Sequence, residues 1–249
     1  QVGLGERSYP IVIGSGVLDT VGARLAEARI GRRWAIITDD VVGPLYGGRV
    51  TESLGAAGID CELFTFAHGE ASKHLATIER LASDLAERGF DRGDAILALG
   101  GGVAGDMAGF LASIYLRGIP FVQVPTSLLA QVDSSVGGKT GVDLAQGKNL
   151  VGTFYQPRAV FIDTDVLRTL PGEEFRGGMA EVIKYGASID ADFFTMLERE
   201  RPAIEALDPA AIVPMIRRCC ELKASVVERD EREGGLRRIL NFGHTIGHA

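Results

Sequence analysis

Cysteine is scarce in this sequence, and long apolar runs are missing from it. The 249 residues include three cysteines, Cys61 and the adjacent pair Cys219 and Cys220, which make a poor disulfide framework. A reducing cytoplasm is therefore the expected compartment. No run of about eighteen apolar residues occurs, which argues against a membrane span. Residues 1–10 also lack the basic and apolar regions of a signal peptide.

An excess of basic charge is also lacking. The 26 lysines and arginines are outnumbered by 33 aspartates and glutamates, so the formal net charge is −7. General nucleic-acid binding requires a basic footprint, and the composition argues against it. A small anionic substrate is still compatible with the charge, because a local group of cations can bind it. Hydrophobic residues make up 46% and charged residues 24% of the chain, the balance of a soluble globular protein.

Short β-rich runs alternate with helical patterns before residue 170. Strands are expected at residues 9–13, 34–38, 62–66, 95–99, 121–124 and 159–162, with helices at 17–28, 74–88 and 105–116. This alternation predicts a mostly parallel sheet with both faces covered. After Leu170-Pro171 the pattern is helical, over residues 173–185, 190–199 and 209–229. We therefore expect an α/β domain over residues 1–170 and an all-helical domain over residues 171–249, incomplete at its C-terminus.

A glycine-rich segment follows the fourth expected strand. Gly100, Gly102 and Gly105 fit the pattern G-x-G-x-x-G, in which a backbone without Cβ atoms can approach a pyrophosphate at a helix N-terminus. The pattern alone is weak evidence, and a tight turn between strand and helix is the alternative. The loop also comes late for a Rossmann fingerprint, and the acids best placed for a ribose, Asp39 and Asp40, end an earlier strand. The sequence therefore predicts a nucleotide site outside an ordinary Rossmann domain.

Residues 236–249 carry a polar stripe on an otherwise apolar helical pattern. Arg237, Asn241, His244 and His248 are spaced so that one helix face would carry all of them. Two histidines at i and i+4 can bind one metal ion, and a histidine pair satisfied in a polar core is the alternative.

Glu181 and Lys184 would share a helix face at i,i+3 spacing. A surface ion pair is the usual explanation of such a pair. The segment follows Gly177-Gly178 and has few other charges, so a buried carboxylate ligand with a neighbouring cation is the alternative.

Several motifs, in their order and spacing, resemble the 3-dehydroquinate synthase family of sugar phosphate cyclases. They lie at residues 101–106, 125–140, 147–149, 179–186 and 241–248, and the resemblance runs from about Ser8 to the last residue. It implies conversion of 3-deoxy-D-arabino-heptulosonate 7-phosphate to 3-dehydroquinate and phosphate. It also implies NAD and a divalent metal, zinc or cobalt, as cofactors, and a homodimer as the assembly.

The resemblance also implies roles for individual residues. Glu181 and His244 match two metal ligands, and the third ligand is expected beyond residue 249. Arg117 matches an arginine that family members lend to the phosphate site of the neighbouring subunit. The positions that match substrate contacts are Asp133, Lys139, Asn149, Lys184, Lys223, Arg237, Asn241 and His248. The positions that match the surroundings of NAD are Asp39, Glu70, Lys73, Gly101, Gly102, Val103, Ala104, Gly105, Asp106, Thr126, Ser127, Lys139 and Lys148.

The chemistry of this family explains the residue types. Its substrate carries a carboxylate and a phosphate, for which lysines supply point charges and arginines bidentate forks. The implied reaction is transient oxidation by NAD, elimination of phosphate, reduction and closure of the ring by an aldol step. The metal would bind vicinal hydroxyls, and the protein would supply position and electrostatics.

Three other functions are open. An inosose or valiolone synthase would share most motifs, although Arg237 and Asn241 match recognition of a carboxylate-bearing substrate. An iron-dependent polyol dehydrogenase would share the glycine loop, but it needs no phosphate pocket and so leaves the cluster of lysines unexplained. A non-catalytic nucleotide-binding regulator would not need to keep every site residue.

Overall fold

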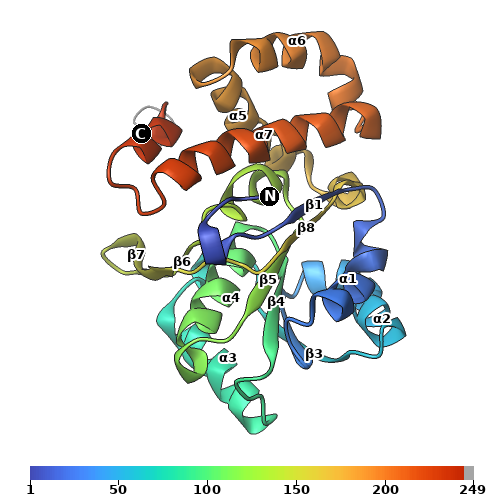
Figure 1. Cartoon of the computed structure of the whole chain (residues 1–249), viewed down its shortest axis with the longest axis vertical. Coiled ribbons are helices and arrows are strands. Elements are labelled where there is room, and N and C mark those ends of the chain that lie inside the picture. Colours follow the sequence, from blue (N-terminus) through green and yellow to red (C-terminus); the bar gives the residue numbers. More distant parts are fainter. Residues whose placement is uncertain (244–249) are drawn as a thin grey trace.

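The computed structural model describes residues 1–243, and its centre is a six-stranded parallel sheet (Figure 1). The strand order is β1-β8-β5-β4-β2-β3, and all neighbouring strands are parallel. The strands are β1 (Ile11–Gly14), β2 (Arg33–Asp39), β3 (Asp60–Phe66), β4 (Ala95–Gly100), β5 (Phe121–Pro125) and β8 (Val160–Asp163). The predicted fold class, an α/β region with a mostly parallel sheet followed by helices, is confirmed.

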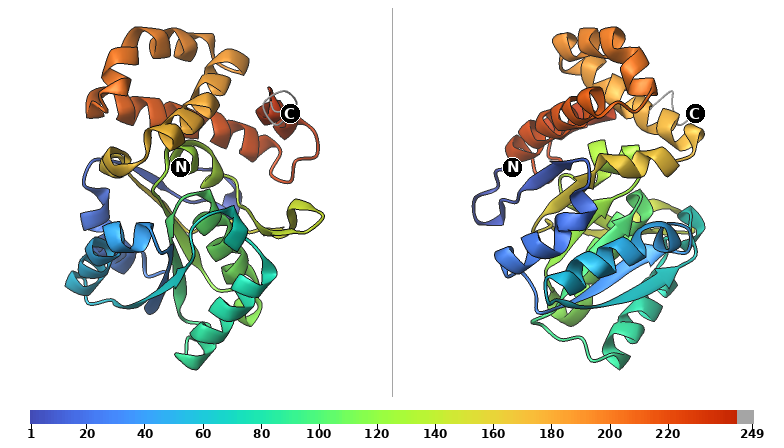
Figure 2. Two further views of the ribbon diagram at one scale, coloured as in Figure 1. Left: turned by 180° about the vertical axis from the view of Figure 1, so that it is seen from behind. Right: turned by 90° about the vertical axis from the view of Figure 1, so that its right-hand side faces the viewer.

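Helices cover both faces of the sheet (Figure 2). On one face, α1 (Val21–Ala28) and α2 (Gly48–Ala56) pack on a buried layer that includes Trp34 and Leu97. On the other face, α3 (Leu75–Glu87) and α4 (Gly102–Ile114) pack on a layer that includes Phe121. Strand β4 is buried along its whole length, as expected of a central parallel strand, and this explains its continuous apolar sequence.

The sequence pattern missed an antiparallel hairpin, and it also missed helix α2. Strands β6 (Lys139–Leu144) and β7 (Gly147–Phe154) form a separate two-stranded sheet that projects beyond the parallel one (Figure 1). The hairpin is rich in glycine, which hides the alternation typical of a strand. Gly141 lies so close to the opposite strand that a Cβ atom there would be 2.5 Å from the Val151 carbonyl oxygen.

The chain beyond the sheet is helical. Helices α5 (Gly172–Ser188), α6 (Ala191–Glu205) and α7 (Pro209–Arg229) lie above the edge of the sheet where its strands end (Figure 1). One hydrophobic cluster joins these helices to β8, through residues such as Tyr185, Met215 and Ile162. This cluster crosses residue 170, and the domain division there stays a prediction. Among residues 1–243, no helix combines the length and apolar character needed to cross a membrane.

The helix expected over residues 236–249 is wrong for the part that the structure describes. Residues Leu236–Asn241 form a short 3-10 helix, and Gly243 has a φ of 80°. Leu240 is buried, but Ile239 and Phe242 are 41% and 59% exposed, so the segment buries little apolar surface that would stabilise an α-helix. His244 and His248 lie outside the described residues. Short 3-10 or π turns elsewhere are Gly5–Arg7, Val17–Thr20, Gly43–Gly47, Glu70–Ser72, Tyr115–Arg117, Ala130–Ser134 and Thr164–Thr169.

Candidate active site

A cavity of about 520 Å³ lies between the N-terminal end of α4, the β6–β7 hairpin and helix α7. Ligands of parallel α/β sheets bind in such crevices beyond the carboxyl ends of the strands. The cavity brings together residues that are distant in the sequence, since its lining includes the predicted site residues Asp106, Asp133, Lys139, Asn149 and Lys223.

The glycine loop forms the turn between β4 and α4. Gly100 has a φ of 155°, and a Cβ atom there would lie 2.6 Å from the Ala104 Cβ, so this position requires glycine. The same Cβ position lies 3.6 Å from Asp39 Oδ2, which places the predicted ribose-binding acid beside the loop. The Thr126 N–H donates to the Gly100 carbonyl oxygen at 2.9 Å and ties the next strand to the turn.

The N-terminal end of α4 suits the phosphates of a dinucleotide. The N-cap residue of this helix is Gly101, which has no side chain to cap it, so the N–H groups of the first turn, from Gly102, Val103 and Ala104, keep their donor capacity at the positive end of the helix dipole. The hydroxyls of Ser127 and Ser134 border this end of the helix, beside Gly101 and Gly102. The residues present therefore fit a bound NAD.

Lys73 connects the glycine helix with the hairpin. Its ammonium donates to Asp106 Oδ2 at 2.7 Å and to Asn149 Oδ1 at 2.6 Å, and the lysine is only 4% exposed. Burial raises the pKa of the Asp106 carboxyl to about 6, although the charge and hydrogen bond of Lys73 oppose the shift. These contacts place the predicted NAD residues Lys73 and Asp106 against the predicted substrate residue Asn149.

The raised pKa of Asp106 predicts how stability depends on pH. Between about pH 4 and pH 6 the folded protein keeps a proton on Asp106 that the unfolded chain has released, so this group lowers the free energy of unfolding as pH rises. We expect the free energy of unfolding of Asp106→Asn, measured relative to the unmodified protein by urea unfolding, to rise by about 3 kcal/mol as the pH increases from about 4 to about 7. The control Asp84→Asn, on the outer side of α3, should follow the unmodified protein. A difference in free energy of unfolding between Asp106→Asn and the unmodified protein that stays constant with pH would contradict the raised pKa of Asp106.

Asp133 and Lys223 form a second ion pair, in which the lysine is buried and the carboxylate, 28% exposed, lines the cavity. The Lys223 ammonium lies 2.8 Å from Asp133 Oδ1 and 2.7 Å from the Asp133 carbonyl oxygen, and the Tyr185 hydroxyl donates to Oδ1 at 2.9 Å. Burial acts to raise the pKa of Asp133, but the charge and hydrogen bond of Lys223, helped by Lys184 and Tyr185, lower it to about 2. Burial in turn lowers the pKa of Lys223.

Glu181 and Lys184 form an ion pair on α5 that is largely buried. The two side chains are 16% and 8% exposed, so the surface ion pair is the wrong alternative. The Lys184 ammonium also donates to the Leu240 carbonyl oxygen at 2.6 Å. Within residues 1–243 no group of three or more histidine, cysteine, aspartate or glutamate side chains could hold a metal ion. The role of Glu181 as a metal ligand, together with His244, stays a prediction.

Arg237 is held by main-chain oxygens at the edge of the site. It is 2% exposed and donates to the carbonyl oxygens of Gly137, at 3.2 Å, and Glu231, at 2.6 Å. Nearby, Glu233 accepts from Lys139 at 2.6 Å and from Asn241 at 3.5 Å. The expected helix face that would carry Arg237 and Asn241 together is therefore absent from the described residues, although both side chains border the site.

Other predicted residues lie away from the cavity. Lys148 and Glu70 form an exposed ion pair at 3.2 Å near the hairpin. Arg117 is exposed and has a φ of 70°, and it follows the C-terminal end of α4, opposite the glycine loop. It therefore does not reach this cavity within the same chain, and its action in a neighbouring subunit stays a prediction.

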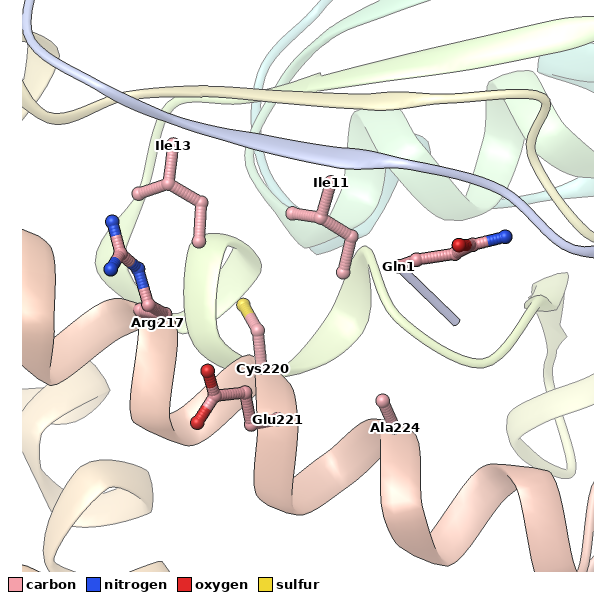
Figure 3. A pocket seen from close by; sticks show the side chains of 7 residues that line it. All are labelled: Gln1, Ile11, Ile13, Arg217, Cys220, Glu221 and Ala224. Atoms are coloured by element: carbon pink, nitrogen blue, oxygen red, sulfur yellow. The ribbon is translucent and has the colours of Figure 1, made fainter. Parts of the chain in front are cut away.

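A separate hollow of about 340 Å³ lies between β1 and α7 (Figure 3). The Cys220 thiol points toward Ile11 and Ile13 across it. Burial raises the pKa of this thiol to about 12, so it is an unreactive core cysteine. None of the residues that line the hollow is a predicted site residue.

Two family models match the chain, one after the other. The model described as 3-dehydroquinate synthase N-terminal matches residues 63–177, and the model described as 3-dehydroquinate synthase C-terminal matches residues 178–249. The chain belongs to the 3-dehydroquinate synthase family. The resemblance read from the sequence motifs is thereby confirmed, and with it the enzyme class.

Curated members of the 3-dehydroquinate synthase family share about half of the sequence. The 3-dehydroquinate synthase of Geobacter metallireducens is 55% identical over 248 residues, and that of Desulforamulus reducens is 52% identical over 249 residues. Each match covers 100% of this chain and 69% of the relative. The chain thus spans about 69% of the length of these relatives.

Solved structures of other cyclases have the same fold. The 2-epi-5-epi-valiolone synthase ValA of Streptomyces hygroscopicus, with NAD⁺ and Zn²⁺ bound, has a TM-score of 0.87 and 31% identity, covering 97% of this chain and 67% of that one. A 2-deoxy-scyllo-inosose synthase complexed with carbaglucose-6-phosphate, NAD⁺ and Co²⁺ has a TM-score of 0.85 and 32% identity, covering 96% and 66%. An iron-containing alcohol dehydrogenase at 15% identity, TM-score 0.69, covers 88% and 67% and shares the fold alone. The chain is more similar in sequence to the 3-dehydroquinate synthases than to these two other cyclases, which favours the 3-dehydroquinate synthase activity.

Sequence reasoning missed residues that hold the site together. Tyr185 contacts Asp133, Glu233 contacts Lys139, and Asp143 contacts Asn149. Tyr185 directly follows Lys184 in the motif at residues 179–186. Its place in that motif is the signal that could have marked it as a partner of Asp133. Glu233 stands in a run of charged residues that is typical of a solvated surface, so no pattern marked it.

Proposed function

We propose that this chain carries out the 3-dehydroquinate synthase reaction with NAD and a divalent metal, on 3-deoxy-D-arabino-heptulosonate 7-phosphate. The observation that carries the proposal is the single cavity in which Asp106, Asp133, Lys139, Asn149 and Lys223 meet. These residues join the predicted cofactor side, at α4, to the predicted substrate side, at α7 and the hairpin. The membership in the family supports the same reaction.

The residues of this chain bind and orient the two ligands. The glycine loop would hold NAD, which would supply transient oxidation of a ring hydroxyl to a ketone and so acidify the neighbouring C–H bond for the loss of phosphate. A divalent metal bound at Glu181 would polarise that hydroxyl. Asp39 would accept a hydrogen bond from the ribose, and the N–H groups at the N-terminal end of α4 would bind the pyrophosphate.

The lysines of the site are each paired with an acid, which decides how an anionic substrate can bind. Lys223 and Lys184 are buried against Asp133 and Glu181, whereas Lys139 is 49% exposed in its pair with Glu233. Lys139 therefore loses the least contact when it turns toward a phosphate. Ion pairs of this exposure contribute little, about 0–1 kcal/mol, so the exchange of partner is inexpensive.

Catalytic use of NAD is the decisive test. We expect phosphate to be released from the heptulosonate phosphate in excess over the NAD⁺ present, with Zn²⁺ or Co²⁺ added and no lasting rise in absorbance from NADH. The reason is that a cyclase returns the electrons to the substrate in each turnover. One NADH for each substrate consumed would instead establish a polyol dehydrogenase.

Cytoplasmic location and a symmetric homodimer belong to the same proposal. The dimer follows from Arg117, which is exposed, far from the cavity of its own chain and similar to an arginine that acts in the neighbouring subunit. Sedimentation at micromolar concentration should show a dimer. Mixing Arg117→Ala chains with chains inactivated by Asp133→Asn should restore part of the activity, and a fully active monomer would refute the assignment.

A further inference from the structure

Asp143 lies at the irregular point of the β6–β7 hairpin. The strand register shifts between Val142, which pairs with Val151, and Leu144, which pairs with Gly147, so Asp143 lies opposite the longer stretch of residues 148–150. Its backbone N–H donates to the Lys73 carbonyl oxygen at 2.7 Å, and its Oδ1 accepts from the Asn149 N–H at 2.7 Å. Bulges often re-aim side chains beside active sites, and this one links the segment before α3 to the hairpin.

The contact with Asp143 holds Asn149 in an unusual conformation. Asn149 has a φ of 56°, in the left-handed region, which asparagine adopts more readily than most residues with a side chain but still at some cost. A charge-assisted hydrogen bond to its N–H offsets such a cost. In this conformation Asn149 Oδ1 accepts from the Lys73 ammonium at 2.6 Å, and the same ammonium donates to Asp106.

These contacts form a closed ring. The ring runs from the Lys73 carbonyl oxygen through Asp143 and Asn149 back to the Lys73 ammonium. Asp143 itself lies outside the cavity of the candidate active site and borders a neighbouring hollow of about 500 Å³ together with Glu70 and His74. Within residues 1–243, its side chain contacts the site through the Asn149 N–H.

We propose that Asp143 is a positioning residue for cofactor binding, which sets Asn149 against the Lys73 ammonium and thereby aims Lys73 and Asp106 at NAD. The inference rests on the proposed function, because it assumes that NAD occupies the glycine loop. In this proposal the carboxylate acts without touching either ligand. It fixes the backbone of Asn149. The Asn149 side chain then accepts from the Lys73 ammonium, as Asp106 also does.

The test compares two replacements of Asp143 by their affinity for NAD⁺, measured by titration calorimetry without substrate. Asp143→Ala removes the acceptor, and we expect the Kd to rise about tenfold, which corresponds to about 1.4 kcal/mol. Asp143→Asn keeps an oxygen in the same place and should stay within about threefold of the unmodified protein, since the hydrogen bond weakens but survives. Gln146→Ala, an exposed change in the turn of the same hairpin, is the matched control and should leave the Kd unchanged.

A double-mutant cycle separates positioning from general stability. In an Asn149→Ala background, Asp143→Ala should change the Kd for NAD⁺ no further, because the carboxylate acts through Asn149. An Asp143→Ala protein that melts earlier but binds NAD⁺ as tightly as before would overturn the proposal, and so would equal losses in the two backgrounds. If Asp143→Ala does not fold, Asp143→Glu decides the question by the same criteria. Failure of the unmodified protein to bind NAD⁺ would instead overturn the proposed function.

Discussion

Lys223→Met is expected to lower the free energy of unfolding by about 3 kcal/mol, because it leaves the Asp133 carboxylate without its hydrogen-bonded cation. Lys223 is 5% exposed, and its ammonium contacts both Oδ1 and the carbonyl oxygen of Asp133. Methionine fills the same space without charge or donor. The remaining partner of Oδ1, the Tyr185 hydroxyl, is neutral and cannot replace the lost attraction.

The pH dependence of this loss has a definite sign. The folded-state pKa of Asp133 is about 2, below the usual 3.8, so the stability from the pair is present above about pH 4 and is lost as pH falls through 2. The difference between the unmodified protein and Lys223→Met should therefore shrink as pH falls from about 5 to about 2. Urea unfolding curves across this range measure it.

Two variants make the comparison specific. Arg201→Met removes a cation from the exposed i,i+4 pair with Glu205 on α6 and should cost less than about 0.5 kcal/mol. The double variant Lys223→Met with Asp133→Asn removes both charges and should regain part of the stability, since replacing a whole buried pair is cheaper than breaking it. Equal losses for Lys223→Met and Arg201→Met would show that the pair is not a buried one.

The parallel sheet could be predicted from the sequence because its strands are buried on both faces. Residues 95–99, for example, are continuously apolar and end in glycines, which identifies a central strand and the turn after it. Boundaries were less accurate. Strand β1 was expected from Tyr9, but Tyr9 pairs only in an isolated bridge with Val2, and the strand begins at Ile11.

Elements that depend on long-range packing could not be predicted. Helix α2 contains Gly48 and Gly55, which weaken its local preference, and it is stabilised by Val50 and Leu54 against the sheet. The expected helix from residue 236 failed for the opposite reason. Its spacing was helical, but Ile239 and Phe242 have no apolar partner that would bury them in the described part of the chain.

The site could be predicted as a set of residue types and matched positions, together with the Glu181–Lys184 pair at i,i+3 spacing, but its long-range pairs could not. Tyr185 and Asp133 are 52 positions apart, and Lys139 and Glu233 are 94 positions apart. Local patterns contain no information on such contacts. The motifs therefore indicated which cations would bind an anionic substrate, while only the fold shows that each lysine is already paired with an acid.

Gly137→Ala is the second change with a large expected effect, because this glycine makes room for Arg237. A Cβ atom at Gly137 would lie 2.4 Å from Arg237 Nη2 and 2.9 Å from Val227 Cγ2, and the φ of 99° is unfavourable for alanine. Backbone strain and overpacking together should cost about 2–4 kcal/mol in the free energy of unfolding. The guanidinium would also be pushed from the Gly137 carbonyl oxygen that it contacts.

Gly58→Ala separates strain from crowding. Gly58 has a φ of 72°, and nothing lies within 4 Å of its Cβ position, so alanine there should cost only about 1 kcal/mol. If Arg237 serves the carboxylate-bearing substrate, Gly137→Ala should raise the KM for the heptulosonate phosphate much more than the Kd for NAD⁺, because the glycine loop lies on another element. Urea unfolding and steady-state kinetics measure the two effects. A Gly137→Ala protein as stable as Gly58→Ala would show that Arg237 moves aside freely, and parallel losses in substrate and NAD⁺ binding would refute its role in substrate recognition.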